Sequence, residues 1–318
     1  MDRARWRKQV NPPAARPGLV ALITVMALAL LSVSPALARR PHGFSGQPEN
    51  DTFIPPRTPA EAAFERVKLD IAAGVRQFAL RAAARPTRAG LARTDSFCIS
   101  DCGGGGGGDG GGTGGGTTAP ALTVILDARA RRQSTSFWCG PASGQVVINY
   151  SRGYVFSNLT GDGTSTNWTS QDTIAGWMKT TESAGTLGSN LAAALNRPDA
   201  VLKPQPEWSY LYATNADGAD MHAKIVTDIG KYSMPLVIAV RPHAVDAAYY
   251  LPSWPKELPG AKHWITIYGY DGFWDGTDGP QVYYTESAGN GGKSPGPYNV
   301  GSLTMWKVNQ YNAKTIVW

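Results

Sequence analysis

An almost unbroken glycine tract divides this sequence into two unequal parts. Between Gly103 and Gly116 only Asp109 and Thr113 interrupt the run of glycines. A segment of this composition cannot bury enough apolar surface to fold, and it behaves as a flexible linker. The tract therefore predicts a linker over residues 103–120 and a folded domain over residues 121–318.

The N-terminus has the pattern of a secretory signal. A basic region precedes an apolar run from Leu19 to Val33, and Ala36-Leu37-Ala38 follows it. This order predicts a signal peptide over residues 1–38, cleaved after Ala38. The run is shorter than the roughly 20 residues that a membrane span needs, and an uncleaved anchor is the alternative. We therefore expect a secreted or cell-envelope protein whose membrane contact is limited to this segment.

Residues 39–102 contain one predicted amphipathic helix, at about residues 58–84. The segment Thr58-Pro59-Ala60-Glu61 supplies a hydroxyl, a proline and a carboxylate in the order of a capping box. Apolar residues then recur at spacings of three and four and predict one apolar stripe: Phe64, Val67, Ile71, Val75 and Phe78. Such a helix packs on the following domain or the cell envelope, or it is a propeptide.

The positive charge of the chain is confined to its N-terminal part. The whole sequence has 30 Lys and Arg against 24 Asp and Glu, and residues 1–120 carry 15 against 9 of these. Residues 121–318 therefore carry 15 against 15 (30 − 15 and 24 − 9). A neutral domain has no basic surface of the kind that a phosphate backbone requires, so we predict no nucleic-acid partner.

The order of predicted elements in residues 121–318 is typical of an α+β fold, with helices first and antiparallel strands after. A short β-prone run at 122–126 precedes a helix from Cys139 to about Tyr150. Hydrophobic periodicity predicts further helices at 170–178, 188–196 and 221–232. It then predicts a buried strand at 235–241, a half-buried strand at 263–270 and a partner strand at 281–285.

Cys139 is the candidate nucleophile. It precedes Gly140-Pro141 and an apolar run, which places its thiol at a predicted helix N-terminus. The free backbone N–H groups there favour negative charge, and proline suits the first helical turn. The other two cysteines, Cys98 and Cys102, lie beside the glycine tract, where they pair or stay as free thiols. Two thiols do not complete a structural zinc site.

Among the four histidines, His263 is the candidate base. It begins a predicted strand and therefore projects from a rigid element at the end of a sheet. The other three are expected to have structural roles: His42 in a loop before the linker, His222 on a helix surface, and His243 after a strand.

These residues together resemble a known family. Gln133 lies six residues before Cys139-Gly140, and His263 begins an aromatic and apolar strand that ends in Gly269-Tyr270-Asp271-Gly272. The next strand ends in an acidic residue. This order resembles the papain-like peptidases that process double-glycine leaders, and in particular their secreted relatives without a transporter. The resemblance covers Leu122 to Trp318.

The resemblance implies roles for individual residues. Cys139 would be the nucleophile and His263 the base, while Gln133 and the backbone N–H of Cys139 would bind the oxyanion. The family orients its histidine with an aspartate, usually followed by proline, at the end of the next strand. This chain has Glu286-Ser287 at that place, so we assign Glu286. Asn290 is the alternative, since an amide orients the histidine in related enzymes.

The sequence thus predicts an α+β, papain-like domain with N-terminal helices packed on a C-terminal antiparallel sheet. Its predicted function is that of an exported cysteine peptidase, which hydrolyses peptide bonds through a thioester on Cys139. We expect a peptide or protein substrate, cleaved at glycine-rich sequences, and no cofactor or metal. Two alternatives are a catalytically degenerate binding domain at the cell surface and a cell-wall peptide amidase or transpeptidase. The oligomeric state stays open.

Overall fold

A computed structural model of the chain describes residues 56–84, 120–153, 169–243, 248–255, 261–289 and 295–318. The predicted signal peptide, Cys98, Cys102, the glycine tract, His42 and Asn290 lie outside the described residues. Within these ranges, no helix is both long and apolar enough to cross a membrane.

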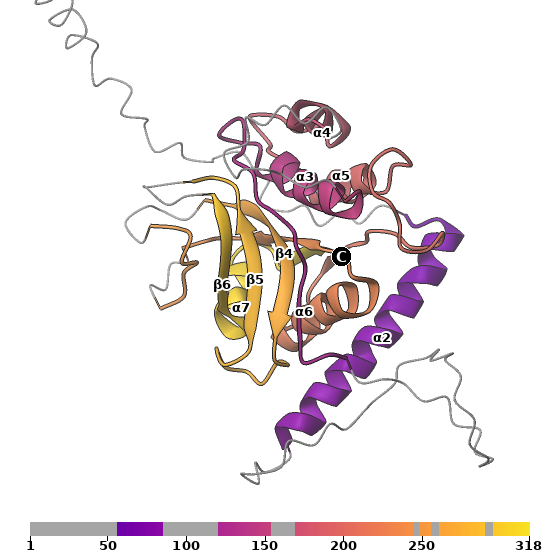
Figure 1. Cartoon of the computed structure of the whole chain (residues 1–318), viewed down its shortest axis with the longest axis vertical. Coiled ribbons are helices and arrows are strands. Elements are labelled where there is room, and N and C mark those ends of the chain that lie inside the picture. The colour runs from indigo at the N-terminus through magenta and orange to yellow at the C-terminus, as the bar shows by residue number, and fades with distance from the viewer. Residues whose placement is uncertain (1–55, 85–119, 154–168, 244–247, 256–260, 290–294) are drawn as a thin grey trace, which may run out of the picture. The chain divides into compact units, whose positions relative to one another are not determined.

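The centre of the fold is a seven-stranded antiparallel sheet (Figure 1). Its strand order is β2-β7-β3-β4-β5-β6, and β1 pairs with the part of β4 that extends beyond β3. The strands are β1 (Thr123–Ile125), β2 (Tyr212–Thr214), β3 (Leu236–Val240), β4 (His263–Asp271), β5 (Gln281–Glu286), β6 (Gly296–Gly301) and β7 (Thr315–Val317).

The helices are arranged around this sheet. In Figure 1, α3 (Cys139–Ser151), α4 (Gln171–Trp177) and α5 (Gly188–Leu195) gather above the strands. Behind the strands lie α6 (Gly218–Ile225) and α7 (Ser302–Gln310). The helix predicted at 221–232 is α6 followed by a π-helical segment, η2 (Val226–Lys231). The predicted α+β class, with helices packed on an antiparallel sheet, is confirmed.

The prediction that strand β4 is half-buried was wrong. Every residue from His263 to Tyr270 is buried, and only Asp271 is partly exposed. The reason is that α3 packs on one part of this strand while α6 and η2 contact it as well. Both faces of such a central strand are buried, so the alternation of its side chains does not correspond to one buried and one solvent-exposed face.

Helix α2 (Pro59–Ala84) begins with the predicted capping box. The backbone N–H of Thr58 donates to the Glu61 carboxylate at 2.9 Å, and the N–H of Glu61 donates to the Thr58 hydroxyl at 3.2 Å. The predicted apolar stripe is wrong at one position, because Val67 is 47% exposed whereas Lys68 is fully buried. The lysine lies four residues after Phe64, which gives it the inward position on the helix.

Lys68 fixes α2 to the rest of the domain. Its ammonium lies 2.7 Å from the carboxylate of Asp228 on η2, and both side chains are fully buried. The rings of Trp208 and Trp318 lie 4.9 and 4.7 Å from the ammonium. Burial raises the pKa of Asp228 to about 6, although the charge of Lys68 opposes this shift.

The C-terminal part of α2 packs beside the end of β4 that is opposite His263. The helix packs on α6 and η2, and Phe78 makes an edge-to-face contact with Phe273, just beyond the end of β4. His263 is the first residue of that nine-residue strand, so about 27 Å of extended chain separates the two ends. This contact places the C-terminal part of α2 at the other end of β4 from His263.

Candidate active site

Three elements bring together the residues that the sequence singled out. Cys139 is the first residue of α3, His263 is the first residue of β4, and Glu286 is the last residue of β5. Because β4 and β5 are neighbouring antiparallel strands, the start of one lies beside the end of the other. The sheet topology therefore places a histidine and an acidic side chain at the same end of two neighbouring strands.

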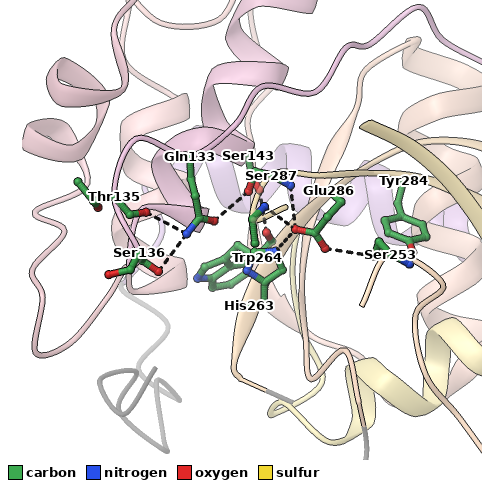
Figure 2. Close-up of polar contacts among 11 residues, drawn as sticks. Gln133, Thr135, Ser136, Ser143, Ser253, His263, Trp264, Tyr284, Glu286 and Ser287 are labelled. Atoms are coloured by element: carbon green, nitrogen blue, oxygen red, sulfur yellow. Dashed lines mark hydrogen bonds and ion pairs between the residues drawn. The ribbon is translucent and has the colours of Figure 1, made fainter. Parts of the chain in front are cut away.

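His263 and Glu286 form a buried, charge-assisted hydrogen bond. Nε2 of His263 lies 2.7 Å from Oε1 of Glu286, and neither side chain is exposed (Figure 2). Burial alone would lower the pKa of His263, but the charge of Glu286 and the interaction with Cys139 outweigh it and raise this pKa to about 10. Burial also acts to raise the pKa of Glu286, yet the charge of His263 brings it below its usual value. The pair is therefore an imidazolium and a carboxylate.

The Glu286 carboxylate is held from several directions. Its Oε1 accepts hydrogen bonds from the backbone N–H groups of Ser287 and Ala288, both at 2.8 Å. Its Oε2 accepts a hydrogen bond from the hydroxyl of Ser253 at 3.2 Å. The additional methylene of glutamate lets the carboxylate curl back over its own strand end and still reach His263. A proline at position 287 has no N–H and could not make the first of these bonds.

Cys139 is a further neighbour that acts on His263. The thiol is buried, and it contributes a hydrogen bond and a charge interaction to the pKa of His263. Nε2 of His263 contacts Glu286, and Nδ1 is buried without a hydrogen-bond partner in the described residues, so Nδ1 is the ring nitrogen that can serve the thiol. The ring nitrogen Nδ1 is thus left available to the thiol, and contacts between nucleophile and base often tighten only when substrate binds.

Helix α3 is fastened to β4 one turn below Cys139. The hydroxyl of Ser143 donates to the carbonyl of Trp264, and the hydroxyl of Thr266 donates to the carbonyl of Ser143, both at 3.0 Å. Ser143 follows Cys139 by four residues and lies on the same face of the helix. Trp264 follows His263 directly, so these two bonds fix the thiol relative to the imidazole.

Gly140 allows the first turn of α3 to pack closely. A Cβ atom at this position would collide with the Thr186 side chain. Thr186 also accepts a hydrogen bond at its carbonyl from the indole of Trp264 at 2.9 Å. The glycine after the cysteine is therefore required by the approach of this neighbouring loop.

Gln133 lies beside the site, but its amide protons are already used. Its Nε2 donates to the carbonyls of Thr135 and Ser136, both at 2.9 Å (Figure 2). Its Oε1 accepts a hydrogen bond from the hydroxyl of Ser287 at 3.2 Å. Gln133 thus closes the loop before Cys139, and an amide N–H becomes available for a ligand only when one of these carbonyls is released.

Two residues of the segment before β4, Ser253 and Trp254, complete the surroundings of the pair, and neither was predicted to contact it. The hydroxyl of Ser253 contacts Glu286 and accepts a hydrogen bond from the hydroxyl of Tyr284 at 2.9 Å. The ring of Trp254 lies 5.5 Å from the imidazole of His263 and is 3% exposed. Both residues contact the pair through tertiary structure alone, and neither belongs to a local motif.

The other described histidines lie outside this site. His222 was predicted on a helix surface, which was wrong, because its side chain is buried and contacts the carbonyl of Gly272 and the hydroxyl of Ser302. Burial lowers the pKa of His222 to about 4, so it is neutral. His243 is half-buried in an isolated bridge with Tyr250.

In the described residues, no group of three or more His, Cys, Asp or Glu side chains is placed to hold a metal ion. The aspartates after β4 have structural partners instead. Asp275 accepts hydrogen bonds from Thr277, and Asp278 accepts two from Thr304 in the first turn of α7.

Comparison with known proteins agrees with this architecture. The family model described as "Peptidase_C39 like family" matches residues 125–310, which include Gln133, Cys139, His263 and Glu286. A search of curated proteins gave no match. The matched region covers more than half of the chain, from β1 through α7. The chain therefore belongs to the Peptidase_C39-like family of papain-like cysteine peptidases.

Proposed function

We propose that this protein is an exported cysteine peptidase that hydrolyses peptide bonds through a thioester on Cys139. The observation that supports the proposal best is the order of contacts in one buried cluster. The buried thiol lies at the first residue of a helix and helps to raise the pKa of His263, and Nε2 of His263 contacts Glu286 at 2.7 Å. A nucleophile, a base and a group that orients the base are what covalent catalysis by cysteine requires.

In this mechanism His263 first holds the proton of the Cys139 thiol, and the sulfur then acts as the nucleophile. The sulfur attacks the carbonyl carbon of the peptide bond, and the carbonyl oxygen becomes an oxyanion. His263 then donates its proton to the departing amine as the C–N bond breaks, which leaves a thioester. Neutral His263 next takes a proton from water, the hydroxide attacks the thioester, and the C–S bond breaks to release the acid and restore the pair.

The oxyanion would be stabilised at the start of α3. The backbone N–H of Cys139 is one donor, because N–H groups in the first turn have no partner inside the helix. Gln133 is the second donor in our proposal. It would move one amide proton from the carbonyl of Thr135 or Ser136 to the oxyanion, so that substrate binding replaces a loop contact with a contact to the reacting group.

The surroundings of Glu286 favour an enzyme over a degenerate binding domain. A carboxylate that has lost its role has no reason to stay fully buried, because burial of an unpaired charge is costly. Glu286 is buried and accepts hydrogen bonds from His263, Ser253, Ser287 and Ala288. An amidase or transpeptidase would use the same residues, and only the reaction products distinguish it from a peptidase.

We also propose that the substrate is cleaved at a glycine-rich sequence. The chain carries its own tract from Gly103 to Gly116, before the domain, and the signal-like residues 1–38 favour export. Self-processing at the tract would give a mature N-terminus that depends on Cys139. N-terminal sequencing of the secreted protein and of its Cys139→Ala variant tests this, and identical N-termini would exclude self-processing.

The test of the proposed function is selective alkylation of Cys139. We expect iodoacetamide at neutral pH to label Cys139 in the folded protein, as identified by peptide mapping, and this labelling to be lost in His263→Ala. His243→Ala is the matched control, since this histidine lies outside the site and its loss leaves labelling unchanged. An unreactive Cys139, or one that reacts equally without His263, would overturn the proposal.

A further inference from the structure

Ser287 uses each of its polar groups on the residues around the site. It directly follows Glu286, and it is 5% exposed. Its backbone N–H donates to the Glu286 carboxylate at 2.8 Å, and its hydroxyl donates to Oε1 of Gln133 at 3.2 Å (Figure 2). Its carbonyl accepts the backbone N–H of Gln133 at 2.9 Å. One residue thus contacts both the acid behind the histidine and the loop before the cysteine.

The N–H of Ser287 acts on the oxygen that matters for His263. The same Oε1 of Glu286 accepts the bonds from Ser287, from Ala288 and from Nε2 of His263. Two backbone donors therefore fix the position of the atom that orients the imidazole. Hydrogen bonds to an ionised carboxylate are stronger than neutral ones, so this arrangement also keeps Glu286 charged.

The hydroxyl and carbonyl of Ser287 act on the opposite side. They hold both the side-chain amide and the main chain of Gln133. The amide nitrogen of Gln133 then points to Thr135 and Ser136, in the loop that leads to Cys139. A residue without a hydroxyl at position 287 leaves this amide oxygen buried without its partner.

We propose that Ser287 is a positioning residue that couples the Glu286–His263 contact to the Gln133 loop, and that Glu286-Ser287 is a working alternative to an aspartate followed by proline. The glutamate carboxylate, longer by one methylene, needs a donor at the next residue to hold it in its curled position. Serine provides that donor, and its hydroxyl adds the link to the cysteine loop. This inference rests on the proposed function of the site.

The test uses three substitutions that remove these groups selectively. Ser287→Pro removes both the N–H and the hydroxyl, Ser287→Ala removes the hydroxyl alone, and Ser287→Thr retains both. The first readout is the NMR titration midpoint of the His263 imidazole. We expect Ser287→Pro to weaken proton binding by about tenfold, the factor that corresponds to one charge-assisted hydrogen bond, and Ser287→Ala and Ser287→Thr to titrate like the parent protein.

The second readout is backbone hydrogen exchange in residues 131–138. We expect several-fold faster exchange in Ser287→Ala and parental exchange in Ser287→Thr. Ser302→Ala is the matched control, because Ser302 is also a buried serine that contacts a histidine, His222, outside the site. Ser302→Ala removes a structural hydrogen bond, so we expect it to change the thermal midpoint of unfolding without changing the titration midpoint of His263.

The outcomes separate this inference from the proposed function. If His263→Ala abolishes alkylation of Cys139 while Ser287→Pro titrates like the parent protein, Ser287 has no positioning role and the proposed function stands. If alkylation does not depend on His263, the proposed function itself fails. Should Ser287→Pro not fold, parental exchange in Ser287→Ala overturns the inference, and faster exchange that threonine restores supports it.

Discussion

Replacement of Glu286 by glutamine isolates the charge of the carboxylate from its shape. The amide oxygen of glutamine can accept the hydrogen bonds that Oε1 now receives from His263, Ser287 and Ala288. The amide nitrogen takes the place of Oε2, where the hydroxyl of Ser253 can rotate from donor to acceptor. The side-chain volume and the contacts stay the same, and only the negative charge is lost.

The expected effect on His263 is large. Burial is the strongest influence on the pKa of His263 and lowers it, and the charge of Glu286 is the first of the influences that raise it to about 10. Without that charge we expect the pKa to return to about 6.5 or lower. At pH 8 the ratio of imidazolium to imidazole is then about 100 to 1 in the parent protein and about 1 to 30 in Glu286→Gln.

Proton NMR of the histidine ring measures this ratio directly. The chain has only four histidines, so single variants assign the His263 signal. Glu182→Gln is the matched control, because Glu182 is exposed and its substitution removes the same charge outside the site. A titration midpoint near 6.5 in the parent protein, or the same midpoint in parent and Glu286→Gln, would refute the electrostatic reasoning.

Three further predictions concern stability. Lys68→Met leaves Asp228 buried without its counter-charge, so we expect chemical denaturation to show a loss of about 3–5 kcal/mol in the free energy of unfolding. The added substitution Asp228→Leu should recover most of this loss, and losses that simply add would contradict the pairing. Gly140→Ala places a methyl group against Thr186 and should lower the free energy of unfolding by about 1–3 kcal/mol. The loss should be smaller in a Thr186→Gly background, and equal shifts of the thermal midpoint in both backgrounds would contradict the close contact. Because the pKa of His263 is raised above 6.5 to about 10, its contribution to stability is complete below pH 6.5 and is lost as the pH rises through about 10. The free energy of unfolding should therefore fall over that range, and less steeply in His263→Ala; an identical pH slope in both proteins would exclude this linkage.

Local signals in the sequence predict the elements that frame the site. The capping box at Thr58, the proline of the first turn in α3 and the β-branched run of β3 each act within a few residues. The helix predicted from Cys139 to about Tyr150 matches α3, which ends at Ser151, and the strand predicted at 281–285 matches β5 within one residue. Such segments are predictable because propensity and burial favour the same structure.

Elements that depend on tertiary contacts were not predicted. Strand β6 contains two glycines and a proline, and it forms because β5 offers a partner along its whole length. Strand β7 has only three residues, but it lies between β2 and β3 and is fully buried. Short strands of this kind carry no periodicity of their own, since their position in the sheet decides their structure.

The candidate site divides in the same way. Cys139 and His263 could be proposed from element ends, because a residue at the start of a helix or strand has a predictable place, whereas Glu286 was assigned through the family resemblance. Ser253 and Trp254 could not, since only the fold brings their segment against His263. The buried position of Lys68 was missed for a different reason: a lysine in the core is rare, and hydrophobic periodicity assigns the neighbouring valine instead.

Cleavage of peptides by the purified protein tests the central claim most directly. The measurement is mass spectrometry of a complex peptide mixture after incubation with the parent protein or with Cys139→Ala. We predict new peptide termini with the parent protein and none with the variant, because cleavage requires the thioester on Cys139. No cleavage by the folded parent protein, or equal cleavage by Cys139→Ala, would contradict the assignment of this domain as a cysteine peptidase that acts through Cys139.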